Sequence, residues 1–399
     1  MKPINYGKQD INIDDINSVI KVLKSDYLTQ GPIIPEFEKD FAKYVGAKYA
    51  VAVSNGTAAL HLCALSLGLK TDENVITSPI TFVASANCIK YCGGNVTFCD
   101  IDKKSYLMDL NELEKILRNK NKGFYKGIVI VNFSGLVNDL EKLRNIADNY
   151  GLWIIEDACH SPGGYFIDSS GKKQNSGNGN FADLSIFSFH PVKHIATGEG
   201  GMITTNNKKL YKKLKLLRSH GITKNDNDFI NKTDESLGSN LKINSYPKWY
   251  MEMQTLGYNY RLTDFQAALG ISQLKRANKS LLLRRRIAKK YFNSFKNNDF
   301  IINQSNYFEG HAYHLYVIQV KDRYGLYNFL RSKKIFTQIH YFPCHLMPFY
   351  KKLGHKTGDY PESEKYYSNC ISLPMYPTLS NKEQNYIIDN INSYTNDCK

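Results

Sequence analysis

Apolar positions along the first half of the chain recur with two spacings. The helical spacing first appears over 11–24, where apolar residues return every three or four positions. Between such segments lie short apolar runs, bounded by turn residues, which are typical of buried strands. Together these patterns predict helices at 11–24, 37–45, 58–67, 82–91, 110–117 and 140–150. They predict strands at 49–53, 75–78, 96–99, 128–132, 152–155, 184–189 and 202–205.

The alternation of strands and helices predicts an α/β fold, with a mostly parallel sheet and helices on both faces. In such a sheet, ligands bind beyond the carboxyl ends of the strands. Four positions fall at or just after such ends, namely Gly56-Thr57, Phe82, Asp157 and Lys193. We therefore expect these residues to share one edge of the sheet and to bind a ligand there.

The pattern changes towards the second half of the chain. A polar stretch at 226–250, which ends in aromatic residues, predicts a long loop that serves as a lid or a subunit contact. Thr263 begins a capping box for a helix that runs on towards Phe295. Further strands are expected near 315–320 and 336–341, and a last helix near 386–394. The chain is therefore expected to form a large domain, 1–260, and a smaller C-terminal α+β domain, 261–399.

Lys193 lies on a loop between two predicted strands. The loop begins at His190-Pro191, because proline cannot continue an interior strand, and it ends in the Gly-rich run 197–201. A desolvated amine beside hydroxyls and a histidine is suited to forming a Schiff base with a carbonyl cofactor. A plain structural lysine is the alternative, although the flexible lysine side chain usually keeps its charge in water.

Two other strand ends carry groups that suit a phosphorylated cofactor. At Gly56-Thr57-Ala58 a strand turns into a helix, so backbone N–H groups are presented to an anion. An ordinary strand–helix turn is the alternative. Asp157 ends an apolar strand, and an unpaired acid is costly to bury there. Its cationic partner is either the protonated ring nitrogen of pyridoxal phosphate or an arginine or lysine.

Composition narrows the range of functions. The formal net charge of +15 is spread along the chain, and only Arg284-Arg285-Arg286 forms a dense cluster, so a solvated surface is favoured over nucleic-acid binding. The charge can also attract a phosphorylated substrate, with Lys248 and Arg261 as candidate contacts. No membrane span or secretion signal is evident, and eight scattered cysteines suggest reduced thiols in a cytoplasmic protein. His340 and His345 lack a third ligand, so no metal is expected.

With these elements placed, the sequence resembles the DegT/DnrJ/EryC1/StrS family of sugar-nucleotide aminotransferases over nearly its whole length. The motifs that carry the resemblance are Asn55-Gly56-Thr57-Ala58-Ala59, Glu156-Asp157-Ala158-Cys159-His160, Ser188-Phe189-His190-Pro191-Val192-Lys193, Thr197-Gly198-Glu199-Gly200-Gly201 and Gly257-Tyr258-Asn259-Tyr260-Arg261. The resemblance implies a fold type I pyridoxal phosphate enzyme, similar to aspartate aminotransferase, that works as a homodimer with shared active sites.

The resemblance also implies roles for individual residues. Lys193 would bind the cofactor covalently and shuttle protons, Asp157 would hold the ring nitrogen protonated, and His160 would lie near the ring hydroxyl. Phe82 would stack on the ring. The phosphate would be held by Gly56, Thr57, Ala58 and Ser188, with Asn259 reaching over from the second subunit. Some relatives have histidine where Lys193 stands and act as dehydratases, so the lysine favours transamination.

Within the family, the sequence is most similar to the branch that acts in pseudaminic acid biosynthesis. That branch aminates C4 of a UDP-linked 4-keto-6-deoxy sugar and takes the amino group from L-glutamate. The likeness implies contacts to the nucleotide sugar from Tyr6, Asp26, Tyr27, Leu28, Thr29, Gly56, Ser188, Asn259, Gln338, Ile339, His340 and Tyr341. The stretch 226–250 is longer than usual, which leaves other sugars of the legionaminic, bacillosamine or perosamine type open. A cofactor-binding regulator or scaffold without turnover is the alternative from another class.

Overall fold

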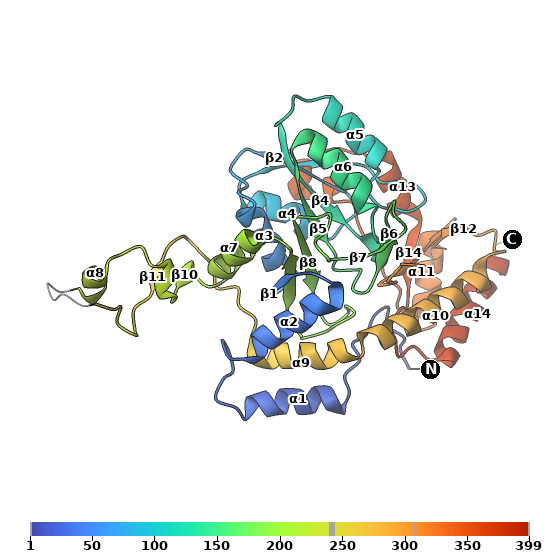
Figure 1. The fold of residues 1–399 in the computed structure, drawn as a ribbon. Coiled ribbons are helices and arrows are strands. Elements are labelled where there is room, and N and C mark those ends of the chain that lie inside the picture. The colour runs from blue at the N-terminus through green and yellow to red at the C-terminus, as the bar shows by residue number, and fades with distance from the viewer. Residues whose placement is uncertain (1, 239–243, 306–308, 398–399) are drawn as a thin grey trace.

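The computed structural model describes residues 2–238, 244–305 and 309–397 and is built around one seven-stranded sheet (Figure 1). The strand order is β1-β9-β8-β5-β4-β2-β3. Only β9 runs antiparallel to its neighbours, and every other adjacent pair is parallel. The strands are β1 Tyr49–Val53, β2 Asn74–Thr77, β3 Asn95–Phe98, β4 Tyr125–Val131, β5 Trp153–Asp157, β8 Leu184–Ser188 and β9 Gly201–Thr205. The predicted mostly parallel sheet is confirmed.

Helices cover both faces of this sheet because successive strand residues point to opposite sides. Val51 and Val53 of β1 pack with α3, α4 and α7, whereas Ala50 and Ala52 pack with α2 and α9. Helices α5 and α6 cover the same face as α2, farther along the sheet. These helices are α2 Ile33–Val45, α3 Gly56–Ser66, α4 Ala84–Tyr91, α5 Leu110–Arg118, α6 Leu140–Tyr150, α7 Lys208–Arg218 and α9 Asp264–Lys275. Helix α1, Ile13–Leu23, packs against α9.

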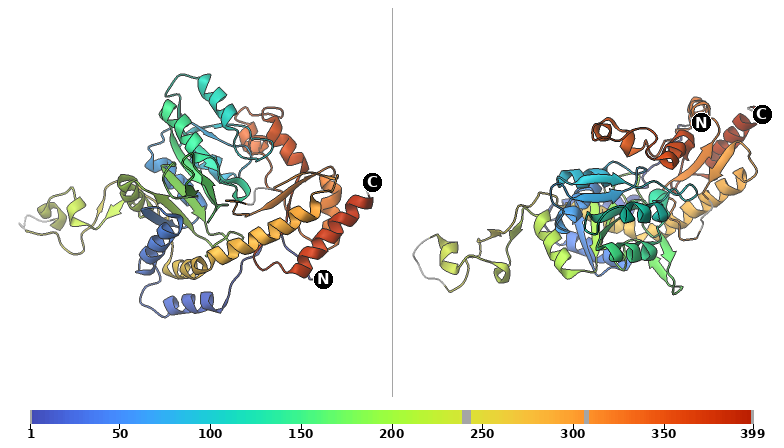
Figure 2. Two further views of the ribbon diagram at one scale, coloured as in Figure 1. Left: turned by 45° about the vertical axis from the view of Figure 1, so that its right-hand side comes forward. Right: turned by 90° about the horizontal axis from the view of Figure 1, so that it is seen from above.

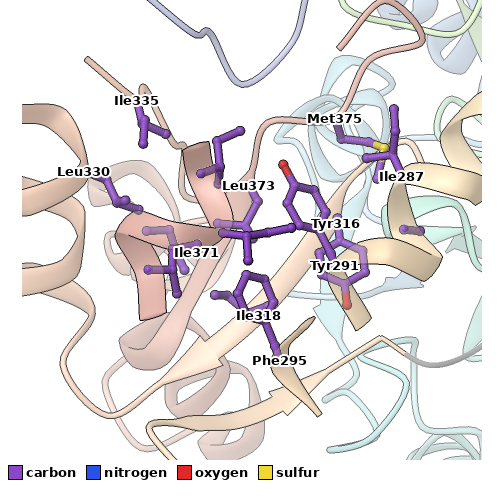
Figure 3. Packing of buried hydrophobic residues seen from close by; sticks show 14 of the residues in the cluster. Ile287, Tyr291, Phe295, Tyr316, Ile318, Leu330, Ile335, Ile371, Leu373 and Met375 are labelled. Atoms are coloured by element: carbon purple, nitrogen blue, oxygen red, sulfur yellow. The ribbon is translucent and has the colours of Figure 1, made fainter. Parts of the chain in front are cut away.

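A second, three-stranded antiparallel sheet follows in the C-terminal part, in the order β12-β13-β14. Its elements are α10 Ala277–Phe295, β12 Ile301–Gln304, β13 Tyr316–Val320, α11 Arg323–Ser332, η3 Cys344–Leu346, α12 Pro348–Lys351, α13 Pro361–Asn369, β14 Cys370–Leu373 and α14 Asn381–Asp397. Tyr291 of α10 and Tyr316 of β13 meet Leu373 of β14 in its core (Figure 3). The domain boundary after residue 260 stays a prediction.

Between α7 and α9 the chain extends away from the body as an arm, which we define as residues 222–238 and 244–256 (Figures 1 and 2). Its paired strands are β10 Ile222–Thr223 and β11 Glu252–Met253, and it also carries η2 Asp226–Asp228 and α8 Thr233–Leu237. The long loop predicted at 226–250 therefore includes short helices, apart from 239–243, which lie outside the described residues. Elsewhere, η1 Phe133–Gly135 and the hairpin of β6 Tyr165–Ile167 and β7 Lys173–Asn175 complete the fold.

Two sequence predictions were wrong in the C-terminal half. The strand expected at 336–341 is absent: Gln338 forms one isolated bridge with Ser372, and the side chains that follow turn to a cavity instead of a ladder. The helix expected to run to Phe295 is broken at Arg276, which caps the end of α9. The Arg276 guanidinium forms ion pairs with Asp10 and Asp15, so the residue at the break fastens the N-terminal segment to α9.

The three-arginine cluster is not simply a solvated surface. Arg284 is 1% exposed, and its guanidinium donates to the backbone carbonyls of Tyr313, His314 and Met375. Burial lowers the pKa of this guanidinium to about 10, which keeps the charge at neutral pH. Arg284 therefore fastens α10 to the segment that leads into β13.

We expect Arg284→Ala to lower the free energy of unfolding by about 2–4 kcal/mol, because three buried carbonyls lose a donor and a cavity remains. Urea denaturation measures the change. Arg286→Ala removes an exposed arginine from the same helix and should change stability by less than about 0.5 kcal/mol. Equal effects from the two variants would show that Arg284 does not fasten the helix.

Among the described residues, no helix combines the length and apolarity that crossing a membrane requires. The seven cysteines that the structure describes are all free thiols.

Candidate active site

A cavity of about 1000 Å³ opens at the carboxyl ends of the central strands. Four segments that follow strands of the large sheet line it, namely Asn55–Ala58 after β1, Thr81–Ala84 after β2, the end of β5 with its following turn, and the loop from Ser188 to Lys193. The opposite wall comes from Tyr6 and the segment 338–342. The edge of the sheet that the sequence indicated is therefore the edge at which the cavity lies.

One end of the cavity is built for an anion. Asn55 caps α3, and its side-chain oxygen accepts a hydrogen bond from the Ala58 N–H at 2.8 Å. The N–H groups of Gly56 and Thr57 have no partner within the helix, since the first turn has none to offer. A side chain at Gly56 would place its Cβ 3.0 Å from the Ser188 Cβ, so glycine suits this close approach without displacing Ser188. The helix end and the Thr57 and Ser188 hydroxyls fit a phosphate group.

Asp157, the last residue of β5, holds its carboxylate on the cavity side. Its Oδ1 accepts from the Cys159 N–H at 3.1 Å, and its Oδ2 accepts from the Ser85 hydroxyl at 2.7 Å. No described arginine or lysine forms an ion pair with it. The ion pair considered as an alternative from the sequence is therefore not formed, and a buried acid is left with room for a cationic ligand group.

Lys193 extends its amine into the same cavity. The Nζ atom lies 3.4 Å from Nε2 of His314, a residue that comes just before β13. Burial lowers the pKa of Lys193, and the nearby Arg284 charge acts in the same direction, while Cys159 and Asp157 oppose it. Burial also lowers the pKa of His314 well below its usual range, so a neutral imidazole faces the amine.

We expect the Lys193 amine of the cofactor-free protein to titrate below the usual lysine value of 10.5. Because only the neutral amine is nucleophilic, a lowered pKa raises the reactive fraction at neutral pH. Trace labelling with acetic anhydride over a pH series, read by mass spectrometry, measures this midpoint. The exposed Lys209 is the internal comparison. A Lys193 midpoint at or above 10.5 would contradict the expectation.

Sequence comparison agrees with this geometry. The chain matches the DegT/DnrJ/EryC1/StrS aminotransferase family over residues 9–392. The chain belongs to this family. It is 36% identical to UDP-4-amino-4,6-dideoxy-N-acetyl-beta-L-altrosamine transaminase of Campylobacter jejuni, over 97% of this chain and 96% of the relative. It is 32% identical to GDP-perosamine synthase of Escherichia coli over the whole of both chains.

A solved structure gives the same result. Helicobacter pylori PseC, an aminotransferase involved in the biosynthesis of pseudoaminic acid, superposes with a TM-score of 0.85 at 28% identity. The match covers 99% of this chain and 100% of PseC. The protein is thus a sugar aminotransferase of the DegT family with fold type I, and it depends on pyridoxal 5'-phosphate as the aminotransferases of this family do.

The residues present fit that cofactor. The helix end at Gly56 has room and free N–H groups for the phosphate, the Asp157 carboxylate faces the cavity without a cationic partner, and the Lys193 amine lies within the cavity. Phe82 lies at the rim, 57% exposed, with its ring centroid 6.2 Å from that of Tyr341. Its stacking on the cofactor ring stays a prediction.

His160 belongs to a small aromatic group on the cavity wall. Its ring lies 4.3 Å from the His314 ring, and its Nε2 lies 3.3 Å from the Tyr341 hydroxyl. Burial, aided by the Lys193 charge, lowers the pKa of His160 well below its usual range. A neutral His160 can therefore exchange a hydrogen bond with Tyr341, and its predicted contact with the ring hydroxyl stays a prediction.

The structure brings together one set of the predicted sugar contacts. Tyr6 reaches the cavity because the N-terminal segment pairs with residues near 335, where the Phe336 N–H donates to the Ile4 carbonyl. The Tyr6 ring lies 5.4 Å from that of His340. Tyr6 lines the cavity with Gln338, Ile339, His340 and Tyr341.

The other set lies outside this chain's cavity. Asp26, Tyr27, Leu28, Thr29 and Asn259 are absent from its described lining. Thr29 bridges to Thr263 and Asn259 bridges to Ser219 through the backbone. Their contacts with substrate stay predictions.

Sequence reasoning missed several residues of the cavity. Thr81 fell between a predicted strand and a predicted helix, and His314 only preceded a strand. Ser85, which lies behind the lining and bonds to Asp157, was only part of the helix predicted at 82–91. A histidine just before an apolar run was a weak indication for His314, and the two hydroxyls gave none. His340 and His345, considered as a metal pair, bond instead to Ser372 and Glu364. Among the described residues no group of side chains suits a metal ion.

Proposed function

We propose that the protein transfers the amino group of L-glutamate to C4 of a UDP-linked 4-keto-6-deoxy-N-acetyl-hexosamine in pseudaminic acid biosynthesis. The observation that carries the proposal is one cavity that holds the Lys193 amine, the Asp157 carboxylate and the α3 N-terminus against a wall of Tyr6 and 338–341. The named activity of the Campylobacter relative supports the choice of sugar nucleotide.

When bound, pyridoxal phosphate supplies an electron sink and carries the amino group between the two substrates. The chain's own residues then divide the remaining work. The Gly56 and Thr57 N–H groups, with Ser188, hold the phosphate. Asp157 stabilises positive charge on the ring nitrogen and keeps the ring oriented.

Lys193 moves the protons. Its neutral amine would take the proton from the substrate carbon that bears the amino group and hold it for return during the transfer. The Nε2 atom of His314 lies 3.4 Å from this amine, so a hydrogen bond between them helps to orient the amine. In the second half of the reaction Lys193 delivers a proton to C4 of the sugar. The two half-reactions predict ping-pong kinetics.

The substrate assay decides between sugars. Purified protein with pyridoxal phosphate and ¹⁵N-glutamate is given UDP-linked 4-keto-6-deoxy-N-acetyl-hexosamine, and the product is identified by mass spectrometry, with NMR for the C4 configuration. We expect ¹⁵N at C4. A GDP-linked 4-keto-6-deoxy sugar tests the second candidate, which the relative GDP-perosamine synthase favours. Amination of the GDP sugar alone would overturn the UDP assignment, and a cofactor band with no turnover on either would favour a regulator.

We also propose that two copies share their active sites. Supporting this, Asn259 lies outside the cavity of its own chain, and the arm carries strongly exposed apolar side chains. Ile230 and Trp249 are each 77% exposed and Leu256 is 75% exposed, which is costly unless a partner covers them.

Mixing two inactive variants tests site sharing. Lys193→Ala protein is incubated with Asn259→Ala protein under conditions that exchange subunits. If Asn259 serves the partner's site, one site of each mixed dimer regains both native residues and activity returns. If activity stays absent while exchange is shown by mass, each site is complete within one chain.

A further inference from the structure

A chain of two buried hydroxyl groups leads to the Asp157 carboxylate. The Thr81 Oγ1 lies 2.8 Å from the Ser85 Oγ, and the Ser85 Oγ lies 2.7 Å from Asp157 Oδ2. Thr81 is 1% exposed, Ser85 is fully buried and Asp157 is 6% exposed. Three different parts of the fold supply these groups: the loop after β2, the first turn of α4 and the end of β5.

The number of protons that each group can donate fixes the direction of these two hydrogen bonds. An ionised carboxylate can only accept, so the single Ser85 hydroxyl proton points to Asp157. The Ser85 oxygen is then the acceptor towards Thr81, and the Thr81 hydroxyl is the donor. Each of the two hydroxyl protons therefore has one acceptor, and the negative charge of Asp157 orients both hydroxyls.

Ser85 is the second residue of α4, so the helix offers its hydroxyl no carbonyl of a preceding turn. The hydroxyl bonds across to the side chain of another element, at a distance typical of a charge-assisted hydrogen bond. The Cys159 N–H donates to Oδ1, so each carboxylate oxygen of Asp157 has a fixed donor. The plane of the carboxylate is thereby held, and further lone pairs remain available to a ligand.

We propose that Ser85 and Thr81 are positioning residues for the cofactor: Thr81 orients Ser85, and Ser85 holds the Asp157 carboxylate in the plane in which it meets the ring nitrogen. This inference rests on the proposed role of Asp157. It adds two hydroxyls that act behind the Asp157 carboxylate, both supplied by the segment that also carries Phe82 at the cavity rim.

The test uses single and double variants of the full chain, read by pyridoxal phosphate affinity and by the pH dependence of the bound cofactor's visible absorbance. We expect Ser85→Ala to weaken cofactor affinity about 10-fold and to shift the absorbance midpoint, because a charge-assisted hydrogen bond is lost. Thr81→Val should act in the same direction by about 3-fold, and Thr81→Ser should restore the native values. In the Ser85→Ala background, Thr81→Val should add nothing, since its effect passes through Ser85.

Thr204→Val is the matched control. Thr204 is a buried hydroxyl on β9 that donates to the Gly177 carbonyl, away from the cavity. Its loss should alter stability and leave both cofactor readouts unchanged. If Thr204→Val moves them as Ser85→Ala does, or if the Ser85 and Thr81 effects multiply, the positioning role is overturned. If Ser85→Ala does not fold, the Thr81→Val and Thr81→Ser variants alone decide whether the positioning role holds.

Asp157→Asn separates this inference from the function on which it rests. If Asp157→Asn leaves the absorbance profile of the cofactor unchanged, the proposed role of Asp157 fails. If Asp157→Asn changes the profile but Ser85→Ala and Thr81→Val do not, only the hydroxyl chain fails.

Discussion

Lys193→Ala should lower the transamination rate by at least about 10³-fold, because one side chain serves as both the covalent attachment and the proton carrier. The amine lies in the cavity next to His314, and no other described lysine lines that cavity. The variant should still bind pyridoxal phosphate, since the α3 N-terminus and Asp157 remain. Its visible band should show unattached cofactor, and borohydride should no longer fix the cofactor to the protein.

The measurement is ¹⁵N transfer from glutamate, together with the change of the cofactor band when glutamate is added. Lys209→Ala, which removes an exposed lysine of α7, is the control and should match the native rate. A Lys193→Ala protein that cycles its cofactor band at the native rate would refute the assignment of the catalytic lysine.

Much of the large sheet could be predicted from the sequence because its central strands are buried on both faces. Such strands read as continuous apolar runs, and β1 was predicted at its observed bounds, Tyr49–Val53. Gly56, Asp157 and Lys193 follow strands of that sheet, so the rule for carboxyl ends placed them at one edge before any contact was known. The cavity lining confirms that placement.

The C-terminal half was harder to predict for a physical reason. A strand needs a partner as well as a pattern, and the segment 336–341 found only one bridge, at Gln338. Its polar and aromatic side chains are used instead as a cavity wall. Helix propensity continues through Arg276, yet tertiary bonds to Asp10 and Asp15 end α9 there. In both cases contacts distant in sequence decide the local structure.

The residues that support the site could not be predicted from the sequence for the same reason. Ser85 and Thr81 are common residues whose role depends on α4 lying beside the end of β5. His314 comes from the C-terminal part and reaches Lys193 because Arg284 holds that segment by its carbonyls. Single residues with distinctive chemistry can be found from sequence, whereas the groups that orient them become evident only when the fold is known.

Asp157 and Glu156 are neighbouring acids on β5, and we expect the first to serve catalysis and the second to serve stability. Successive strand residues point to opposite faces, so Asp157 meets the cavity while Glu156 points away from it. Glu156 is buried in a polar network and accepts hydrogen bonds from Asn132, Ser176 and Ser185. Burial raises the pKa of Glu156 and these hydrogen bonds oppose the rise. The two carboxylates thus have similar burial and different partners.

We expect Asp157→Asn to lower kcat/KM by about 10²–10³-fold with a small change in melting temperature, because the amide keeps the shape but not the charge that stabilises the ring cation. Glu156→Gln should lower the free energy of unfolding by about 1–3 kcal/mol, since an amide cannot accept from all the same donors. Activity per folded molecule should then stay within about 2-fold of native. Thermal melts and steady-state kinetics on both variants give the comparison. The reverse pattern, with Glu156→Gln inactive and Asp157→Asn active, would mean that the other face of β5 holds the reaction site.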